Sequence, residues 1–229
     1  MYTDVLIDPK FFRFLSACDA DLAEEARREG CPQCRGRLHR ANYPRKPRGG
    51  PEAIASEQTY RDSFCCEREG CRRRLTPRSV RFLGRRVYFA IVVLLLSVLE
   101  SGPRRSKARL LEEAVGVSLR TLRRWRLWWQ SFFPRTRFWI AARARLSPPL
   151  EERDLPRELL DRFCGQATDP PDRSSDRLAA ELTEPLSLLL RWLSPLSIAS
   201  PLSFPQADGL GARPKPPQRM PDARTESAS

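Results

Sequence analysis

The spacing of apolar residues near the start of the chain predicts one amphipathic helix. Asp8 is a favourable N-cap, Pro9 suits the first helical position, and Gly30 is a typical helix end. Between them, apolar residues recur at intervals of three and four: Phe11, Phe14, Leu15, Cys18, Leu22 and Ala26. We therefore expect a helix from Pro9 to Glu29 that packs this face against the segment that follows.

Residues 31–86 lack helical periodicity. The segment QTYRDSF, residues 58–64, has the composition of a short strand. The basic, proline-bearing stretch HRANYPRKPRGGP, residues 39–51, reads as a loop, and LTPRSVRFLGRR, residues 75–86, as an extended connector. A small β unit with long loops is the expectation here.

From Gly84 onward the pattern becomes helical again. The apolar run VYFAIVVLLLSVL, residues 87–99, is shorter than the roughly 20 residues that cross a bilayer, so we expect a buried helix and no membrane segment. Two further helices are expected, over Lys107–Val115 and over about Leu119–Ser131. The proline-rich residues beyond 134 predict a mostly disordered tail with one local helix, Asp176–Trp192, interrupted at Pro185.

Charge is unevenly distributed along the chain. The formal net charge is +13, and residues 37–86 carry net +9 while residues 101–145 carry net +10. Two basic blocks of this kind favour a polyanionic partner, although a solvated basic surface is the simpler alternative. The acidic start MYTDVLIDPK does not resemble an export signal, so a reducing cytoplasm is expected. In that compartment clustered cysteines more often bind a metal than form disulfides.

Two cysteine pairs predict a structural zinc site. CPQC at residues 31–34 is a metal-binding turn, and a C-x4-C pair with a glycine before its second cysteine follows at residues 66–71. Cys65 is an alternative to Cys66, and His39 is an alternative ligand that a basic loop more often leaves solvated. The predicted ligands are Cys31, Cys34, Cys66 and Cys71. Four cysteines close the coordination shell, so we expect Zn2+ in a structural role and no enzymatic activity.

Arginines beside the cysteines are candidate phosphate contacts. Arg72, Arg73 and Arg74 follow Cys71 directly, where the metal would hold their backbone still. The basic loop adds Arg45, Lys46 and Arg48.

The stretch LLEEAVGVSLRTLRRWRLWW, residues 110–129, predicts a helix-turn-helix. Gly116 permits a left-handed turn, Val117 fills the core and Ser118 caps the next helix. Leu122, Trp125 and Trp129 share the inner face, whereas Leu127 and Trp128 are expected to be exposed. The candidate DNA contacts are Ser118, Arg120, Thr121, Arg123 and Arg124. An ordinary helical hairpin with a charged outer face is the alternative.

Together these patterns predict a mainly α protein with a small β zinc ribbon. Four parts are expected: an N-terminal helical segment (1–29), a zinc ribbon with a basic loop insert (30–83), a three-helix helix-turn-helix unit (84–133) and a mostly disordered, proline-rich tail (134–229).

CPQC, CRRRLTPRSVRF and AVGVSLRTLRRW, taken together, resemble the zinc-ribbon plus helix-turn-helix N-terminal region of bacterial insertion-sequence transposases and their accessory proteins. The resemblance covers about residues 28–130. It implies that the ribbon and the helices jointly recognise the DNA at the ends of a mobile element. The long gap between the cysteine pairs, the C-x4-C spacing and the missing pattern of a ribonuclease-H-type catalytic domain depart from that family.

The resulting hypothesis is a sequence-specific DNA-binding protein of a mobile element, cytoplasmic and nucleoid-associated, without its own catalytic domain. Double-stranded DNA is the expected partner, and a separate transposase or integrase is a further candidate. An RNA-binding ribbon protein and a transcriptional repressor with the same helix-turn-helix are the alternatives. A transposase that acts alone and a membrane-attached regulator are disfavoured.

Overall fold

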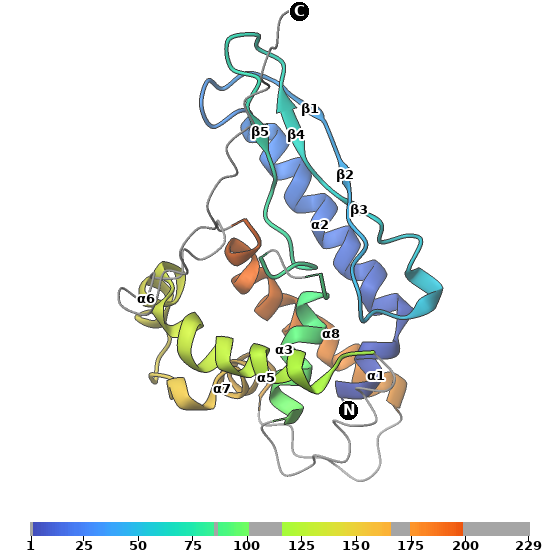
Figure 1. Cartoon of the computed structure of the whole chain (residues 1–229), viewed down its shortest axis with the longest axis vertical. Coiled ribbons are helices and arrows are strands. Elements are labelled where there is room, and N and C mark those ends of the chain that lie inside the picture. Colours follow the sequence, from blue (N-terminus) through green and yellow to red (C-terminus); the bar gives the residue numbers. More distant parts are fainter. Residues whose placement is uncertain (1, 85–86, 101–115, 166–174, 199–229) are drawn as a thin grey trace, which may run out of the picture.

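The computed structural model describes residues 2–84, 87–100, 116–165 and 175–198 (Figure 1). It is mostly helical with small antiparallel sheets, which confirms the expected class. The α-helices are α1 (Tyr2–Ile7), α2 (Pro9–Glu29), α3 (Ala90–Glu100), α5 (Leu119–Leu127), α6 (Arg137–Arg143), α7 (Arg157–Cys164) and α8 (Ser175–Leu193). Short 3-10 turns cover Glu52–Ile54, Phe133–Arg135, Glu152–Asp154 and Ser194–Ser197. The helix predicted over 107–115 lies outside the described residues.

Helix α2 begins and ends where its local signals predict. The Asp8 carboxylate accepts a hydrogen bond from the Lys10 amide at 2.9 Å, and Gly30 ends the helix with a φ of 75°. The inner face is rotated from the prediction, because Phe12 is buried while Phe14 is 41% exposed. Phe12 packs edge-on against Phe89 with ring centroids 4.9 Å apart, so a tertiary contact decides which phenylalanine faces inward.

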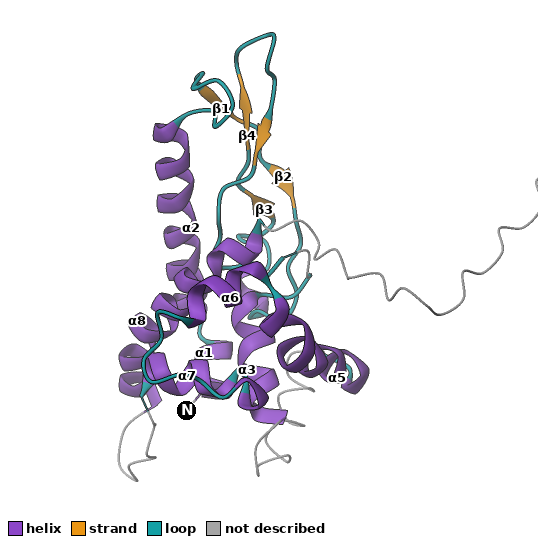
Figure 2. Cartoon of the chain, turned by 90° about the vertical axis from the view of Figure 1, so that its left-hand side faces the viewer, coloured by secondary structure: helices purple, strands orange, loops and turns teal. Residues whose placement is uncertain are grey.

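Two small antiparallel sheets form the narrow end of the molecule (Figure 2). The three-stranded sheet has the order β1 (Leu38–Arg40), β4 (Phe64–Cys66), β5 (Arg74–Leu75), and the two-stranded sheet pairs β2 (Tyr43–Pro44) with β3 (Tyr60–Arg61). The predicted loop 39–51 therefore contains strand residues, and the predicted strand 58–64 is split between β3 and β4. Because the strands are two or three residues long, little backbone pairing holds this end together.

The predicted turn before α5 is present. Gly116 has a φ of 66°, Val117 is buried, and the Ser118 hydroxyl accepts a hydrogen bond from the Thr121 amide at 3.4 Å. Leu122, Trp125 and Trp129 face the core as expected, and Leu127 is exposed. The prediction for Trp128 is wrong: this ring is only 7% exposed, since a π-helical turn over Trp128–Phe132 rotates it inward against Phe133.

The expected disorder beyond residue 134 is wrong for α6 and α7, whereas the local helix predicted over Asp176–Trp192 is present as α8. All three helices join one hydrophobic core with α1, α2, α3 and α5, α6 through Trp139 and α7 and α8 through buried leucines. Helix α8 runs through Pro185 without the expected break. Other prolines lie at element ends, where the missing amide hydrogen costs least: Pro134 and Pro195 open 3-10 turns, and Pro156 precedes α7. Residues 199–229 lie outside the described part.

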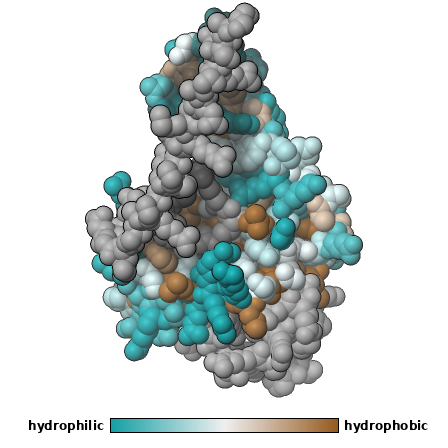
Figure 3. All heavy atoms as spheres, viewed as in Figure 1, coloured by the Kyte–Doolittle hydropathy of each residue, from teal (hydrophilic) through white to brown (hydrophobic). Residues whose placement is uncertain are grey.

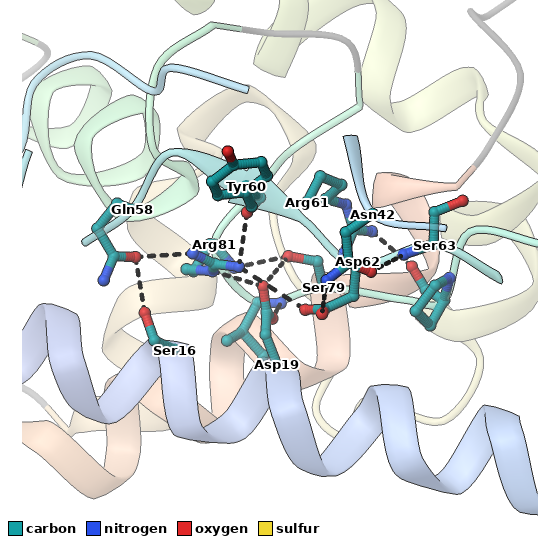
Figure 4. Close-up of polar contacts among 12 residues, drawn as sticks. Ser16, Asp19, Asn42, Gln58, Tyr60, Arg61, Asp62, Ser63, Ser79 and Arg81 are labelled. Carbon is teal, nitrogen blue, oxygen red and sulfur yellow. Dashed lines mark hydrogen bonds and ion pairs between the residues drawn. The ribbon is translucent and has the colours of Figure 1, made fainter. Parts of the chain in front are cut away.

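A buried ion pair connects the sheets to the helical core (Figure 4). Asp19 on α2 accepts hydrogen bonds from the Ser79 hydroxyl at 2.6 Å, the Val80 amide at 2.7 Å and the Arg81 Nε at 2.7 Å. Arg81 also donates to the Gln58 side chain at 2.8 Å and to the Tyr60 carbonyl at 3.3 Å. One carboxylate and one guanidinium thus fix the connector 76–84 against both α2 and β3.

Candidate metal centre

Four cysteine sulfurs converge at the far end of the three-stranded sheet. The sulfurs of Cys31, Cys34, Cys66 and Cys71 all lie within 4.8 Å of one another. Cys31 and Cys71 approach to 3.6 Å, and Cys34 and Cys66 to 3.5 Å, so none is disulfide-bonded. An ion with four sulfur ligands at about 2.3 Å in a tetrahedron separates the sulfurs by about 3.8 Å. The four residues fit such an ion and can hold a metal in a closed shell.

Two tight turns bring these sulfurs together. In the first, the Cys31 amide donates to the Gly36 carbonyl at 2.9 Å and the Arg35 amide donates to the Cys31 carbonyl at 2.7 Å. In the second, the amides of Cys71 and Arg72 both donate to the Arg68 carbonyl, at 2.9 and 3.0 Å. Arg35 and Arg72 take left-handed conformations, with φ of 56° and 43°. Each turn is therefore closed by backbone hydrogen bonds together with one arginine in a left-handed conformation.

The turns also direct backbone amides at the sulfurs. Burial raises the pKa of Cys31, but hydrogen bonds from the amides of Gln33 and Cys34, together with those from the Cys71 and Cys34 thiols, outweigh it and lower that pKa to about 6. At Cys66 the Arg68 amide lowers the pKa, whereas burial and the neighbouring thiols raise it, with a net value of about 12. Closely packed thiols cannot all ionise alone. A bound cation would hold them as thiolates, and the amides are placed to stabilise that form.

A small second core supports the centre. Cys31 and Cys66 are buried together with Ala23 of α2, Leu38 of β1 and Phe64 of β4, and Leu75 packs against them. The C-terminal half of α2 therefore lies under the sheet and holds both turns in place (Figure 1). This explains why the first turn can start immediately after Gly30.

Register separates the adjacent cysteines Cys65 and Cys66. Cys66 pairs with Leu38 and points inward, whereas Cys65 pairs with His39 on β1 and with Arg74 on β5, on the opposite face. The Cys65 sulfur contacts the Arg72 carbonyl at 3.6 Å, so Cys66 and not Cys65 belongs to the cysteine cluster. His39 is 3.0 Å from a Glu67 carboxylate oxygen and is not part of the cysteine cluster.

Gly36 is a supporting residue that the spacing of cysteines does not reveal. A Cβ at this position would lie 3.1 Å from the Cys66 sulfur and 3.3 Å from the Cys34 sulfur. The chain therefore passes so close to the cluster that only glycine avoids crowding two of its ligands.

Gly36→Val is expected to weaken metal binding by about 10–100-fold, the range seen when groups around a metal shell are disturbed. Competition with a chromophoric chelator measures this change. Gly70→Val is the matched control, because a Cβ at Gly70 has nothing within 4 Å. Equal affinities of the two variants would contradict the role of Gly36.

The three arginines after Cys71 are not equivalent. Arg72 and Arg73 are exposed on the second turn, and Arg73 donates to the Gln33 side chain of the first turn at 3.1 Å. Arg74 on β5 instead donates to the Ala41 carbonyl at 2.6 Å and the Ser63 hydroxyl at 3.0 Å, and it lies over the Tyr43 ring. Arg74 is exposed like Arg72 and Arg73, and its contacts also tie β5 to its neighbours.

The three predicted contacts in the basic loop differ in their exposure. Lys46 and Arg48 are exposed. Arg45 is half-buried, donates to the Gly84 carbonyl at 3.1 Å and lies 4.3 Å from the centroid of the Phe82 ring. On α5, Ser118, Arg120, Arg123 and Arg124 are exposed and Thr121 is half-buried. The structure thus brings the four cysteines together, whereas the predicted arginines lie on different elements: the second turn with β5, the basic loop and α5.

Comparison of the chain with protein-family models, with curated proteins and with solved structures gives no match. Within the described residues, none of the helices combines the length and the apolar character that crossing a bilayer requires, α3 included.

Proposed function

We propose that the chain is a non-enzymatic, sequence-specific DNA-binding protein in which zinc holds the cysteine turns and α5 enters the major groove. The observation that carries this proposal is the two-sided character of α5. Arg120, Arg123 and Arg124 are exposed along one side, while Leu122 and Trp125 are buried on the other. Hydrophilic side chains gather over this helix at the front of the molecule (Figure 3).

The position of the positive charge on α5 supports a role in reading DNA. Ser118 caps the helix, so Arg120 and Thr121 lie in its first turn, where recognition helices contact base edges. Arg123 and Arg124 lie one turn further along, where guanidiniums contact bases or phosphates. A rigid presentation follows from the buried Trp125, whose ring packs against Tyr88 with centroids 5.0 Å apart.

Zinc is the metal that the donor set favours. Four thiolates in a tetrahedron suit Zn2+ in structural sites, and a closed shell leaves no position for a substrate or an activated water. The ion would stabilise the turns that carry Arg72 and Arg73, and these exposed guanidiniums are proposed as phosphate contacts.

The resemblance to insertion-sequence transposases extends this proposal to a mobile element, with a separate transposase or integrase as a partner. DNA from the ends of such an element is then the preferred target, and DNA from its promoter is the target if the protein is a repressor. Anisotropy titrations with both duplexes and a shuffled duplex, at several salt concentrations, test the proposal. Equal affinity for all three would refute sequence-specific binding.

The double variant Arg123→Ala/Arg124→Ala is expected to bind DNA at least about tenfold more weakly, because each such arginine contributes about 1–3 kcal/mol. The slope of log affinity against log salt should also fall by about 1 for each phosphate that the variant no longer neutralises. Arg143→Ala is the control: Arg143 lies on α6 and pairs with Glu152 at 2.9 Å. Unchanged affinity and salt slope in the double variant would remove α5 from the interface.

RNA binding is the second candidate, and one exposed aromatic residue favours it. Tyr60 on β3 is 59% exposed, and stacking on such rings is typical of single-strand recognition. Tyr43 is half-buried with Arg74 over its ring, so it is less accessible to a base. Competition between duplex DNA and RNA of one sequence distinguishes the two candidates, and Tyr60→Ala should weaken only RNA binding.

A further inference from the structure

Three guanidinium groups surround one phenylalanine ring where the sheets meet the helical core. The guanidinium carbons of Arg45, Arg81 and Arg61 lie 4.3, 5.3 and 5.5 Å from the centroid of the Phe82 ring. Cation–π attraction stabilises each of them, but it does not neutralise their charge. Arginine also stays protonated in proteins, so the three groups carry three positive charges.

The pairing of β2 with β3 places further donors on the same side. Tyr43 lies directly opposite Arg61 in the register, and Arg45 is two residues beyond Tyr43. Opposed residues and residues two apart share one face of a ladder. Tyr43, Arg45 and Arg61 therefore share the inner face, while Pro44 and Tyr60 are exposed on the outer face.

The two carboxylates beside this cluster, Asp19 and Asp62, both form ion pairs with Arg81. The side chain of Asp19 is fully buried, and its two oxygens accept hydrogen bonds from Ser79, Val80 and Arg81. Asp62 lies 4.0 Å from Arg81 and accepts a hydrogen bond from the Asn42 amide group at 3.3 Å. No carboxylate in the described part of the chain forms an ion pair with Arg61.

Arg61 is the guanidinium of this cluster with the least support from hydrogen bonds. It is 1% exposed, its Nη2 donates to the Pro77 carbonyl, and its Nη1 has no hydrogen-bond partner in the described part of the chain (Figure 4). Burial is the main cause that lowers the pKa of Arg61; Asp19 and Tyr43 oppose this shift, and the charges of Arg81 and Arg45 add to it. A buried donor and a buried charge without partners are both costly, so a group that supplies oxygen acceptors and negative charge would be stabilised here.

We propose that Arg61 and Arg45, with the Tyr43 hydroxyl, form a binding site for a small tetrahedral oxyanion of the phosphate class. Arg45 is half-buried whereas Arg61 is 1% exposed, so we place the entry on the side of Arg45, where movement of its side chain would admit the anion to Arg61. Charge-assisted hydrogen bonds from two guanidiniums are the usual means of binding such a group. The phosphate comes either from free phosphate or from a nucleic-acid backbone, and only the second source rests on the proposed function.

The first experiment uses the zinc-loaded full chain and no nucleic acid. Inorganic phosphate, added to about 10 mM at constant ionic strength, is expected to raise Tm by about 3–5 °C in a saturating manner, while chloride does not. Arg61→Met and Arg45→Met should each lose this shift, and Arg28→Met, which removes an exposed arginine of α2, should keep it. Titration calorimetry on the half-buried Arg45→Met variant provides the same comparison if Arg61→Met does not fold.

A phosphate shift that chloride reproduces, or one that persists in both variants, would overturn the site. The source of the anion is then decided by measuring DNA affinity with and without phosphate at fixed ionic strength. Competition that Arg45→Met abolishes identifies a backbone phosphate, and DNA affinity independent of phosphate identifies a free anion. Because phosphate binding is measured without DNA, loss of the site and loss of DNA binding are separate results.

Discussion

Cys34→Ser is expected to release the metal and unfold the three-stranded sheet. Structural zinc sites contribute about 10–16 kcal/mol of apparent binding free energy, and in small metal domains that energy is folding energy. The strands here are two or three residues long and share a second core of five buried residues, so they have little other support. Loss of one of four ligands should therefore remove most of the stability of residues 31–75.

Metal content by mass spectrometry and amide hydrogen exchange measure this effect. The wild-type chain should carry one metal per molecule, and Cys34→Ser should carry much less and exchange rapidly over β1 and β4. Cys65→Ser is the matched control, because its sulfur lies on the other face of the same strand. A metal-free wild-type chain purified without chelators, or equal behaviour of the two serine variants, would contradict the metal centre.

The second large effect is expected from Asp19→Ala. Arg81 is 6% exposed, and removing its carboxylate partner leaves a buried guanidinium and two further donors, Ser79 and Val80, without their acceptor. Breaking a buried pair in this way costs about 3–5 kcal/mol. Asp19 joins α2 to residues 79–81, which lead from the sheets to the helical core. The substitution should therefore weaken the packing of the sheets on the helical core as well as lower global stability.

Chemical denaturation of the zinc-loaded protein measures the free energy of unfolding. Arg78→Ala is the control, since the exposed Arg78 lies 3.9 Å from a Glu25 carboxylate oxygen and surface pairs contribute at most about 1 kcal/mol. A destabilisation by Asp19→Ala no greater than that of Arg78→Ala would show that the buried pair is not what connects the two parts.

The amino-acid sequence by itself determined the features that depend on neighbouring residues. Asp8, Pro9 and Gly30 define the ends of α2 because capping and φ preferences act within one turn. The four cysteines were predictable because a metal site needs two tight turns, and each turn is encoded in six residues or fewer. Gly116 and Ser118 mark the start of α5 for the same local reason.

Only the tertiary structure decided the features that depend on distant partners. Proline content suggested disorder over α6 and α7, yet both are ordered because Trp139, Leu159 and Leu160 find a common core with α1, α2 and α3. Arg61 appears in the sequence as a further member of a basic block, and its pairing in the β2–β3 ladder turns it inward. Asp19 pairs with Arg81 across 62 positions of the chain, an interaction that no local pattern encodes. Burial and charge pairing depend on where the chain folds back on itself, and short-range preferences carry no information about that.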